Sequence, residues 1–339
     1  MTKRVLITGA GGSIGCHVLR HLLKNTDWEI VALDSFRHKG LTDRIWRVTH
    51  KHPETLSRLK VFTHDLRAPI SNMLTEKMGP IDYIVDMASM TDVFDSIQHP
   101  VQYVQSNVSE ILTMLEYARS IKPEIFLQVS TDEVYGPTDS KTFYSEWAPI
   151  LPSNPYSASK AAQEAIATSY WRSYDVPLII TNMMNNFGEM QSPIKFMMLV
   201  MSALATGSTV TIHGTADAIG SRHYIHSRNA ADAFLFLLKN TKPLLHVDGA
   251  VDRPDRYNVT GDRSVSNLEF AQLIAKAWGK PLKYAFEPGR VTRPGHDSHY
   301  GASGSKIEAL GWKAPMSLED SLRLTVEWYK RNPEWLRPW

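Results

Sequence analysis

The sequence has little cysteine and no long apolar run, and each absence excludes a class of protein. Its single cysteine, Cys16, excludes an intrachain disulfide and any metal site made from several cysteines. No apolar run approaches the roughly 20 residues of a membrane helix, and the apolar stretch after Lys3 and Arg4 is interrupted too early by glycine for a secretory signal. We therefore expect a soluble cytoplasmic protein with no metal ion and no membrane partner.

A large excess of one charge is also missing. The chain has 37 Lys and Arg against 35 Asp and Glu, a formal net charge of +2, so no extended field is available to hold nucleic acid. Any bound phosphate must therefore be held by local groups. What the sequence does have is length. Its 339 residues, 43% of them hydrophobic, can bury a large core and, at about 100–200 residues per domain, suggest two domains or one extended one.

A glycine-rich turn near the start predicts a phosphate site. Residues 5–7 are typical of a buried parallel strand, and they lead into Thr8-Gly9-Ala10-Gly11-Gly12-Ser13-Ile14-Gly15, followed by a helical pattern. Three of these glycines have the spacing G-x-x-G-x-x-G. Glycine allows a tight turn and a close approach of the main chain to a pyrophosphate, while the helix N-terminus supplies amides. The pattern indicates a dinucleotide site.

The next strand indicates which dinucleotide binds. Residues 29–33 form a second apolar run that ends in Asp34, close to the offset of about 20 residues at which a carboxylate holds the adenosine ribose. This favours NAD as the cofactor. NADP stays open because Arg37, with His38 and Lys39 beside it, lies where an arginine can pair with a 2′-phosphate.

Strands alternate with helical patterns along the first half, which predicts an α/β fold with a Rossmann-type, doubly wound parallel sheet. Ligands of such sheets bind at the carboxyl ends of the strands. Two further apolar runs end in Asp65 and Leu66, expected near the adenine, and in Ala88 and Ser89, expected near the linked riboses. The cofactor site is thus predicted to draw on several strand ends.

The sequence also suggests how the chain is divided. We expect residues 1–183 to form the cofactor-binding domain, with segments near 223–260 returning to it, and residues 184–339 to form mainly a smaller substrate-binding domain. The stretch 182–201 holds six methionines, whose flexible side chains fill irregular space, so we interpret it as a loop and helix packed between the domains. Cys16 is interpreted as a structural residue.

A tyrosine and a lysine one helical turn apart are the first catalytic candidates. Tyr156 and Lys160 stand at i and i+4 in a helical pattern, downstream of a strand that ends in Ser130 and Thr131. An ammonium near a phenol lowers the phenol pKa from about 10 toward the range of a base at neutral pH. The spacing alone is common by chance, but here it follows a dinucleotide pattern and a polar strand end.

At this point the chain resembles the extended short-chain dehydrogenase/reductase superfamily, and within it the nucleotide-sugar 4,6-dehydratases typified by dTDP-glucose 4,6-dehydratase. The resemblance extends over nearly the whole chain. Its discriminating marker is the acidic pair Asp132-Glu133, because relatives that only epimerise generally carry small or hydroxyl residues there. The other markers are residues 8–15, 154–160, 185–188, 257–259, 293–297 and 327–332.

The resemblance implies a reaction in which NAD is used and regenerated. Tyr156 would remove the proton of the sugar 4-hydroxyl, with Thr131 bonded to the same oxygen. Glu133 would take the C5 proton, and Asp132 would donate a proton to the departing 6-hydroxyl. The product would be a 4-keto-6-deoxy sugar nucleotide. The residue types support this division, because elimination needs one ionised and one protonated carboxyl, and close carboxyls push their pKa values apart.

The resemblance also implies two sets of binding residues. The cofactor set is Gly9, Gly12, Ser13, Ile14, Gly15, Asp34, Asp65, Leu66, Ala88, Ser89, Asn107, Val129, Tyr156 and Lys160. The nucleotide-sugar set is Thr131, Asn185, Lys195, Arg222, Asn258 and Arg293. The cations of the second set are suited to a diphosphate, since arginine offers a planar fork and lysine a point charge.

Departures from the family pattern leave the substrate open. Residues 91–95 read Thr-Asp-Val-Phe-Asp where the family usually has Ser-His-Val-Asp-Arg, and His223 follows Arg222 where an aspartate is usual. The sugar and the base, dTDP, UDP or another, are therefore not determined. A UDP-sugar 4-epimerase or decarboxylase, and a non-catalytic NAD-binding regulator, remain alternatives. An apolar stripe over residues 101–115 predicts an amphipathic helix that either faces the core or forms a homodimer.

Overall fold

The computed structural model describes residues 2–38, 40–50, 52–139, 141–248, 252–287 and 299–337. Its centre is a seven-stranded sheet in the order β12-β6-β5-β4-β1-β2-β3, with every neighbouring pair parallel. The order reverses between β1 and β4, which confirms the predicted Rossmann-type fold. The strands are β1 (Arg4–Thr8), β2 (Glu29–Asp34), β3 (Leu59–Thr63), β4 (Tyr83–Asp86), β5 (Ile125–Thr131), β6 (Leu178–Met183) and β12 (Asp255–Val259).

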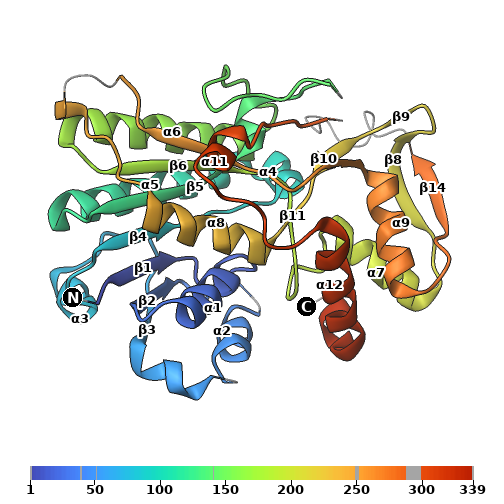
Figure 1. Ribbon diagram of the computed structural model, residues 1–339, viewed down its shortest axis with the longest axis horizontal. Helices are drawn as coiled ribbons and strands as arrows, with labels where there is room; N and C mark the ends of the chain where they lie inside the picture. The colour runs from blue at the N-terminus through green and yellow to red at the C-terminus, as the bar shows by residue number, and fades with distance from the viewer. Residues whose placement is uncertain are drawn as a thin grey trace.

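Helices cover both faces of this sheet (Figure 1). Alternate strand residues point to opposite faces, so that Val5 and Ile7 belong to one apolar core and Leu6 to the other. The first core is covered by α1 (Gly15–Asn25), α2 (Leu41–Thr49) and α8 (Ser227–Asn240). The second is covered by α3 (Asn72–Met78), α5 (Pro100–Ile121) and α6 (Pro155–Tyr174), and the short α4 (Val93–Gln98) contacts α5 and α6.

Local sequence explains where the helix that carries the Tyr-Lys pair begins. The Asn154 side chain accepts a hydrogen bond from the Ser157 amide, and the Ser157 hydroxyl accepts one from the Asn154 amide. Pro155 occupies the first turn, where a missing amide hydrogen has no cost. This capping box fixes the start of α6 and thereby places Tyr156 beside the end of β5.

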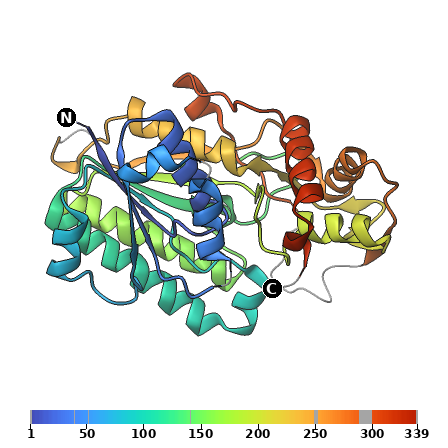
Figure 2. The ribbon, with the colours of Figure 1, turned by 90° about the horizontal axis from the view of Figure 1, so that it is seen from below.

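The C-terminal elements gather at one end of the sheet (Figures 1 and 2). A small sheet, β14-β8-β9, lies there with three helices. The chain also returns to the large sheet, where α8 packs on α1 and β12 pairs with β6. The elements of this part are α7 (Phe196–Thr206), β8 (Val210–Thr215), β9 (Ala218–Ile219), α9 (Asn267–Trp278), β14 (Tyr284–Glu287) and α12 (Leu318–Arg331). The short α11 (Ser305–Ala309) contacts β12 of the large sheet instead.

Short segments complete the described chain. Two small pairings, β7 (Asn186–Phe187) with β11 (Ile225–His226) and β10 (Ser221–His223) with β13 (Ser264–Ser266), lie between the two parts. The 3-10 turns are η1 (Pro53–Arg58), η2 (Asp132–Tyr135), η3 (His246–Asp248) and η4 (Pro333–Leu336). All six methionines of the stretch 182–201 are buried, as expected for side chains that fill irregular space.

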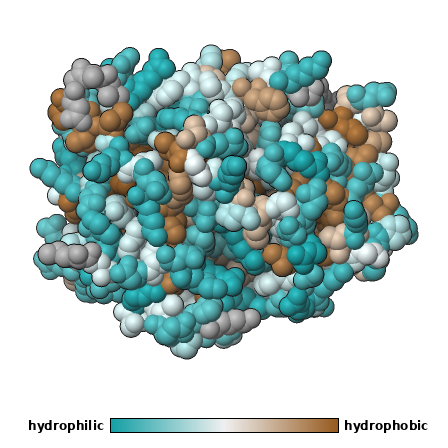
Figure 3. Space-filling view, in the orientation of Figure 1, coloured by the Kyte–Doolittle hydropathy of each residue, from teal (hydrophilic) through white to brown (hydrophobic). Residues whose placement is uncertain are grey.

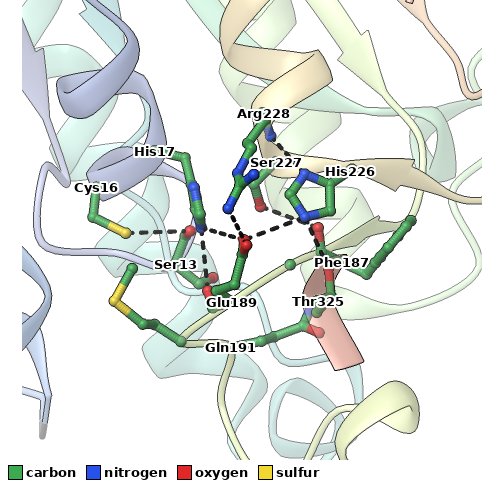
Figure 4. A network of polar contacts seen from close by, with 12 residues as sticks. Ser13, Cys16, His17, Phe187, Glu189, Gln191, His226, Ser227, Arg228 and Thr325 are labelled. Carbon is green, nitrogen blue, oxygen red and sulfur yellow. Dashed lines mark hydrogen bonds and ion pairs between the residues drawn. The ribbon is translucent and has the colours of Figure 1, made fainter. Parts of the chain in front are cut away.

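A buried ionic network joins α1 to the returning segments (Figure 4). At its centre is Glu189, in the loop after β7, with 2% of its side chain exposed. Its carboxylate pairs with His226 at 3.3 Å, with His17 of α1 at 3.7 Å, and with Arg228 of α8. The hydrogen bond from His226 and the charges of the neighbouring side chains hold the pKa of Glu189 far below its usual value although burial acts in the opposite direction. The network links the glycine-turn helix to the chain that enters the second half.

Next to this network lies the single cysteine. Cys16 is fully buried, its thiol contacts the Ser13 carbonyl oxygen at 3.5 Å, and burial raises the pKa of the thiol to about 12. A thiol with this pKa is unreactive, which confirms a structural part for Cys16.

One face of the molecule is largely polar. The face seen in Figure 3 carries mostly hydrophilic residues, with hydrophobic ones in separate patches. Within the described ranges, no helix has the length and apolar character that a membrane crossing requires.

Candidate active site

A cavity opens at the carboxyl edge of the large sheet, at the switch point between β1 and β4. Its wall comes from the turn after β1, the ends of β2, β4, β5 and β6, the start of α2, the loop after β3, the middle of α5 and the first two turns of α6. The lining residues are Gly9, Gly12, Ser13, Ile14, Gly15, Leu33, Asp34, Ser35, Arg37, His38, Leu41, His64, Leu66, Met87, Ala88, Ser89, Met90, Thr91, Glu110, Val129, Ser130, Tyr156, Lys160 and Met183.

The glycine turn has the close main-chain packing that its sequence predicted. Gly9 has a φ of +63°, in the left-handed region. A Cβ atom on Gly15 would lie 2.1 Å from the Gly9 carbonyl oxygen, a distance that no side chain tolerates. The amide of Gly12 donates to the same oxygen at 2.9 Å. Only glycine fits at Gly15, and the turn leaves room above the N-terminus of α1.

Asp34 ties the second strand to this turn. Its carboxylate is 8% exposed and accepts hydrogen bonds from the amides of Gly11, at 2.9 Å, and Phe36, at 3.0 Å. The side chain lines the cavity, as predicted for a residue that holds a ribose.

The cavity fits a polar cofactor such as NAD. Three side-chain oxygens in its wall, Ser89 Oγ, Ser130 Oγ and Glu110 Oε2, are buried and have no hydrogen-bond partner among the residues described. Buried polar atoms are costly unless they are bonded, so these atoms suit a ligand with hydroxyl or amide groups. The glycine turn beside them would hold the pyrophosphate of such a cofactor.

Two residues of the predicted cofactor set do not line the cavity. Asp65 is held by Arg67, whose guanidinium lowers the carboxyl pKa to about 2. Asn107 is fully buried, and its amide donates to the Met90 carbonyl and to Ser159 Oγ while its oxygen accepts from the Met90 amide. Direct cofactor contact is therefore wrong for Asn107, which positions the loop after β4.

Several lining residues were not singled out from the sequence. Met87, Met90 and Thr91 surround the predicted Ala88 and Ser89, and the general rule on strand ends could have found them. Glu110 had no such signal, because it lies in the middle of α5 and only the packing of that helix brings it to the cavity.

The Tyr-Lys pair is buried at the inner end of the cavity. The Lys160 ammonium donates to the Val129 carbonyl at 2.9 Å and to Gln163 Oε1 at 2.5 Å. Burial lowers the pKa of Lys160 to about 8, against the nearby carboxyls of Asp86, Glu164 and Glu110.

The Tyr156 hydroxyl behaves differently from the prediction. Burial, followed by the charge of Glu133, raises its pKa, and the Thr131 hydroxyl is the group that opposes this rise. The expected lowering by Lys160 is therefore wrong for this side-chain arrangement, because the ammonium is bonded to main chain and to Gln163. The residue spacing gave the proximity of the two side chains but not the direction in which the ammonium points.

The acidic pair lies in η2, directly after β5. Asp132 is 3% exposed, and its Oδ2 has no partner in the part of the chain that the structure describes. Burial, followed by the charge of Glu133, raises the Asp132 pKa to about 7, although Arg222 acts in the opposite direction. Glu133 Oε2 accepts a hydrogen bond from Asn154 at 3.4 Å. The raised pKa makes Asp132 a candidate proton donor near neutral pH.

The described side chains of the predicted substrate set differ in their protein partners. Asn185 has a buried Oδ1 without a hydrogen-bond partner among the described residues. Arg222 is 4% exposed, lies 4.5 Å from the Tyr300 ring centre, and is close enough to affect Asp132. Lys195 pairs with Asp92 at 3.4 Å.

Two predicted substrate residues need separate comment. Asn258 is fully buried, donates to the carbonyls of Tyr144 and Ser303, and accepts from the Tyr135 hydroxyl. Both of its amide hydrogens are used, so we correct its assignment from substrate contact to positioning of the loop around Tyr144. Arg293 lies outside the described residues.

The part of the chain that the structure describes contains no group of three or more His, Cys, Asp or Glu arranged to hold a metal ion. The cavity wall supplies a phenol, an ammonium and hydroxyls, and the two neighbouring carboxyls Asp132 and Glu133 lie directly after β5, next to this wall. This set is suited to proton transfer around a hydroxyl group beside a dinucleotide.

Comparison with known proteins agrees with this geometry. Residues 6–325 match the family described as GDP-mannose 4,6 dehydratase. A probable dTDP-glucose 4,6-dehydratase from Sinorhizobium fredii is 30% identical over 99% of this chain and 95% of its own length. The crystal structure of a dTDP-glucose 4,6-dehydratase from Streptomyces venezuelae, with NAD bound, is 30% identical with a TM-score of 0.84, covering 98% of this chain and 100% of that one.

The fold alone is shared more widely. A UDP-glucose 4-epimerase from Thermus thermophilus, in complex with NAD, superposes with a TM-score of 0.82 over 96% of this chain and 99% of its own, at 24% identity. Because the family match spans nearly the whole chain and the dehydratases are similar over their full length, the chain belongs to the GDP-mannose 4,6 dehydratase family, the nucleotide-sugar 4,6-dehydratases of the short-chain dehydrogenase/reductase superfamily.

Proposed function

We propose that the enzyme removes water from a nucleotide hexose, converting it into the 4-keto-6-deoxy sugar nucleotide. The observation that carries this proposal is the pair Asp132-Glu133 beside Tyr156, in which Asp132 has a pKa raised to about 7. An epimerase would use the same Tyr156 and Lys160 but has no need for an acid and a base at both of these positions.

The protein's own groups divide the proton transfers. Tyr156 accepts the proton of the sugar 4-hydroxyl, and Thr131 bonds the same oxygen. When bound, NAD supplies the acceptor and later the donor of a hydride and, in its oxidised form, a positive charge that favours the Tyr156 phenolate. Lys160, whose pKa is lowered to about 8, holds the end of β5 through the Val129 carbonyl and adds positive charge to this part of the cavity.

The acidic pair performs the elimination. Glu133 accepts the proton from C5, which the 4-ketone makes acidic, and Asp132 donates a proton to the leaving 6-hydroxyl. Atoms balance because one proton is taken from carbon, one is given to oxygen, and water leaves. Burial raises the Asp132 pKa to about 7, so that the protonated form that this step requires is available near neutral pH.

The second half of the chain is proposed to bind the nucleotide sugar. We assign residues 1–183, with the returning segments near 223–260, mainly to the cofactor and residues 184–339 mainly to the substrate. This assignment rests on the pairing of β12 with β6 and the packing of α8 on α1. Asn185, Lys195 and Arg222 are the described residues proposed to contact the sugar diphosphate. The base and the sugar stay open because the loops that contact them depart from the family pattern.

Incubation with nucleotide sugars in deuterated water tests the proposal. Purified enzyme is mixed separately with dTDP-glucose, UDP-glucose and GDP-mannose, and products are followed by mass spectrometry. We expect loss of one water and uptake of one solvent deuteron at C5 with one of them. Isomerisation without loss of water would identify an epimerase instead, and retention of NAD with no product from any sugar would favour a non-catalytic regulator.

A Glu133→Gln variant separates the two halves of the reaction. It should still oxidise C4, seen as absorbance of reduced NAD at 340 nm, and then stall before elimination. Normal turnover of this variant would remove Glu133 from the proposed base position. Asp139→Asn, a change in the exposed loop after η2, serves as the matched control and should leave the rate unchanged.

We also propose a homodimer and a cytoplasmic location, where nucleotide sugars and NAD are available. The apolar stripe of α5 splits into two groups: Ile111 and Leu115 are buried, whereas Val101, Val104 and Leu112 are 66%, 38% and 37% exposed. Exposed apolar residues on one helix face favour pairing with a second copy. Light scattering should give twice the chain mass for the wild type and one chain mass for Val104→Glu. An unchanged mass in the variant would exclude this face.

A further inference from the structure

An arginine lies in the cofactor cavity at the position where NADP-binding proteins recognise the 2′-phosphate. Arg37 follows Asp34 by three residues, and both side chains line the cavity. A free guanidinium there would form two parallel hydrogen bonds with a phosphate and would favour NADP. The surroundings of Arg37 therefore decide how well the cavity rejects that cofactor.

Carboxylates hold Arg37 on two sides. Its Nη1 lies 3.5 Å from Asp65 Oδ2, in the loop after β3, and its Nη2 lies 3.6 Å from Glu110 Oε1, on α5. Its Nε donates to Ser35 Oγ at 3.2 Å. All three guanidinium nitrogens thus have partners within the protein, and a phosphate would have to displace two negative charges to reach them.

Glu110 is the unusual member of this group. It is 5% exposed and lies in the middle of a helix. Its Oε1 accepts a hydrogen bond from Ser106 at 3.1 Å, whereas Oε2 is buried without a hydrogen-bond partner among the described residues. Burial raises the Glu110 pKa to about 7, although the Ser106 hydroxyl, Arg37 and Lys160 act against this rise. A half-satisfied buried carboxyl is costly, so a benefit at the cavity must offset it.

We propose that Glu110 is a specificity-determining residue: it holds Arg37 away from the cofactor and, with Asp34, makes this end of the cavity repel the 2′-phosphate of NADP. The pairing of Arg37 and the repulsion of the phosphate both weaken the binding of NADP. Pairing with Glu110 and Asp65 removes the only arginine fork among the described lining residues, and the ionised form of Glu110, whose Oε2 has no hydrogen-bond partner among those residues, adds negative charge at this end of the cavity. Discrimination between NAD and NADP thus depends on the loop after β3 and on α5 as well as on the end of β2.

A competition experiment tests this proposal without relying on catalysis. The purified holoenzyme is incubated with equal concentrations of NAD and NADP until the bound ratio is constant, and the dinucleotides released by denaturation are quantified by mass spectrometry. We expect almost pure NAD from the wild type and a bound NADP-to-NAD ratio at least tenfold higher for Glu110→Gln. An unchanged ratio in Glu110→Gln would overturn the proposal.

Further variants test the part played by Arg37. Combining Glu110→Gln with Arg37→Ala should abolish most of the gain in NADP, because the released guanidinium is what binds the phosphate. If the gain persisted, Glu110 would act by its charge alone and the pairing argument would fail. Asp65→Asn, in an exposed loop, should release Arg37 in part and give a smaller gain, so the proposal stays testable even if Glu110→Gln does not fold.

Glu116→Gln is the matched control. Glu116 lies on the same helix, is half-exposed, and pairs with Arg119 at 2.6 Å, away from the cavity. Its variant should keep the wild-type ratio. A rise equal to that of Glu110→Gln would show that the effect comes from a general change in α5 and would overturn the assignment to Glu110.

Discussion

Glu189 and Asp132 are both almost completely buried carboxyls, with 2% and 3% exposure, but their surroundings differ. Glu189 is surrounded by His17, His226 and Arg228, and its pKa is held far below the usual value. Asp132 lies beside a second carboxyl, keeps one oxygen unpartnered among the described residues, and has a pKa raised to about 7. Burial is the same in the two cases, so the neighbouring charges decide the protonation state.

This difference separates a structural site from a chemical one. Glu189 has three ion-pair partners, on α1, at the start of α8 and in α8, and His226 bonds Thr325 of α12 (Figure 4). Glu189 has no proton to exchange near neutral pH. An incompletely paired carboxyl such as Asp132 costs stability when it ionises but can deliver a proton. Neutralising Asp132 should therefore lower the reaction rate and not the stability, whereas neutralising Glu189 should lower the stability.

The largest effect is expected for Asp132→Asn. The amide keeps the shape and the acceptor for Thr131 but cannot donate the proton for elimination, so the turnover rate should fall by about 10²- to 10⁴-fold. Stability should stay equal or rise, because a carboxyl that is unfavourable when ionised has been removed. Steady-state kinetics and urea unfolding measure the two quantities. If Asp132→Asn lost stability and kept its turnover rate, Asp132 would be a structural residue and not a chemical one.

Glu189→Gln should show the reverse pattern. Removing the buried central anion leaves His226 and the partly exposed Arg228 without their partner carboxylate, and breaking a buried pair typically costs about 3–5 kcal/mol, which sets the upper limit of the expected loss. Urea unfolding of the holoenzyme measures this loss. Glu327→Gln, which removes an exposed partner of Arg323 and Arg331, is the control and should change stability by less than about 1 kcal/mol. Equal effects of the two changes would show that the network does not stabilise the fold.

The contributions of His17 and Asp132 to stability should also depend on pH in opposite directions. Burial lowers the pKa of His17 to about 4 from 6.5, so its contribution to stability is present above pH 6.5 and is lost as pH falls through 4. The raised pKa of Asp132 gives a contribution that is present below pH 3.8 and lost as pH rises through 7. Between pH 4 and 7, His17→Gln should flatten the acid loss of stability, by up to about 3 kcal/mol, and Asp132→Asn should steepen it. Parallel curves for the wild type and both variants would contradict these assignments.

The smallest effect is expected at the entrance of the substrate site. Asp92 Oδ2 pairs with Lys195, while its Oδ1 accepts from the Asp95 amide and caps α4. Asp92→Asn keeps the cap and removes the charge that competes with a substrate diphosphate for Lys195. The KM for the nucleotide sugar should fall a few-fold, about 0.5–1 kcal/mol, with an unchanged kcat. Asp95→Asn is the control, and a KM that rises in Asp92→Asn would contradict the proposed competition.

Local sequence was enough for the strands, the glycine turn and the start of α6. The predicted run at residues 29–33 and the observed strand Glu29–Asp34 differ by one residue, because apolar periodicity and turn residues act over short distances. Asp34 and the glycines line the cavity as predicted, since their spacing from each strand end is fixed along the chain. Asn258 was misassigned because its partners, at Tyr144 and Ser303, are distant in sequence.

The sequence by itself therefore determined the fold class, the cofactor turn, and the presence of a phenol, an ammonium and two carboxyls at one sheet edge. Only the tertiary structure decided how these groups are charged. Proximity along a helix placed Lys160 near Tyr156, but packing directed its ammonium to Val129 and Gln163. Likewise, only the packing of α5 placed Glu110, in the middle of that helix, beside Arg37. The pKa and pairing of a buried group depend on every charge around it, and those charges come from segments that only folding brings together.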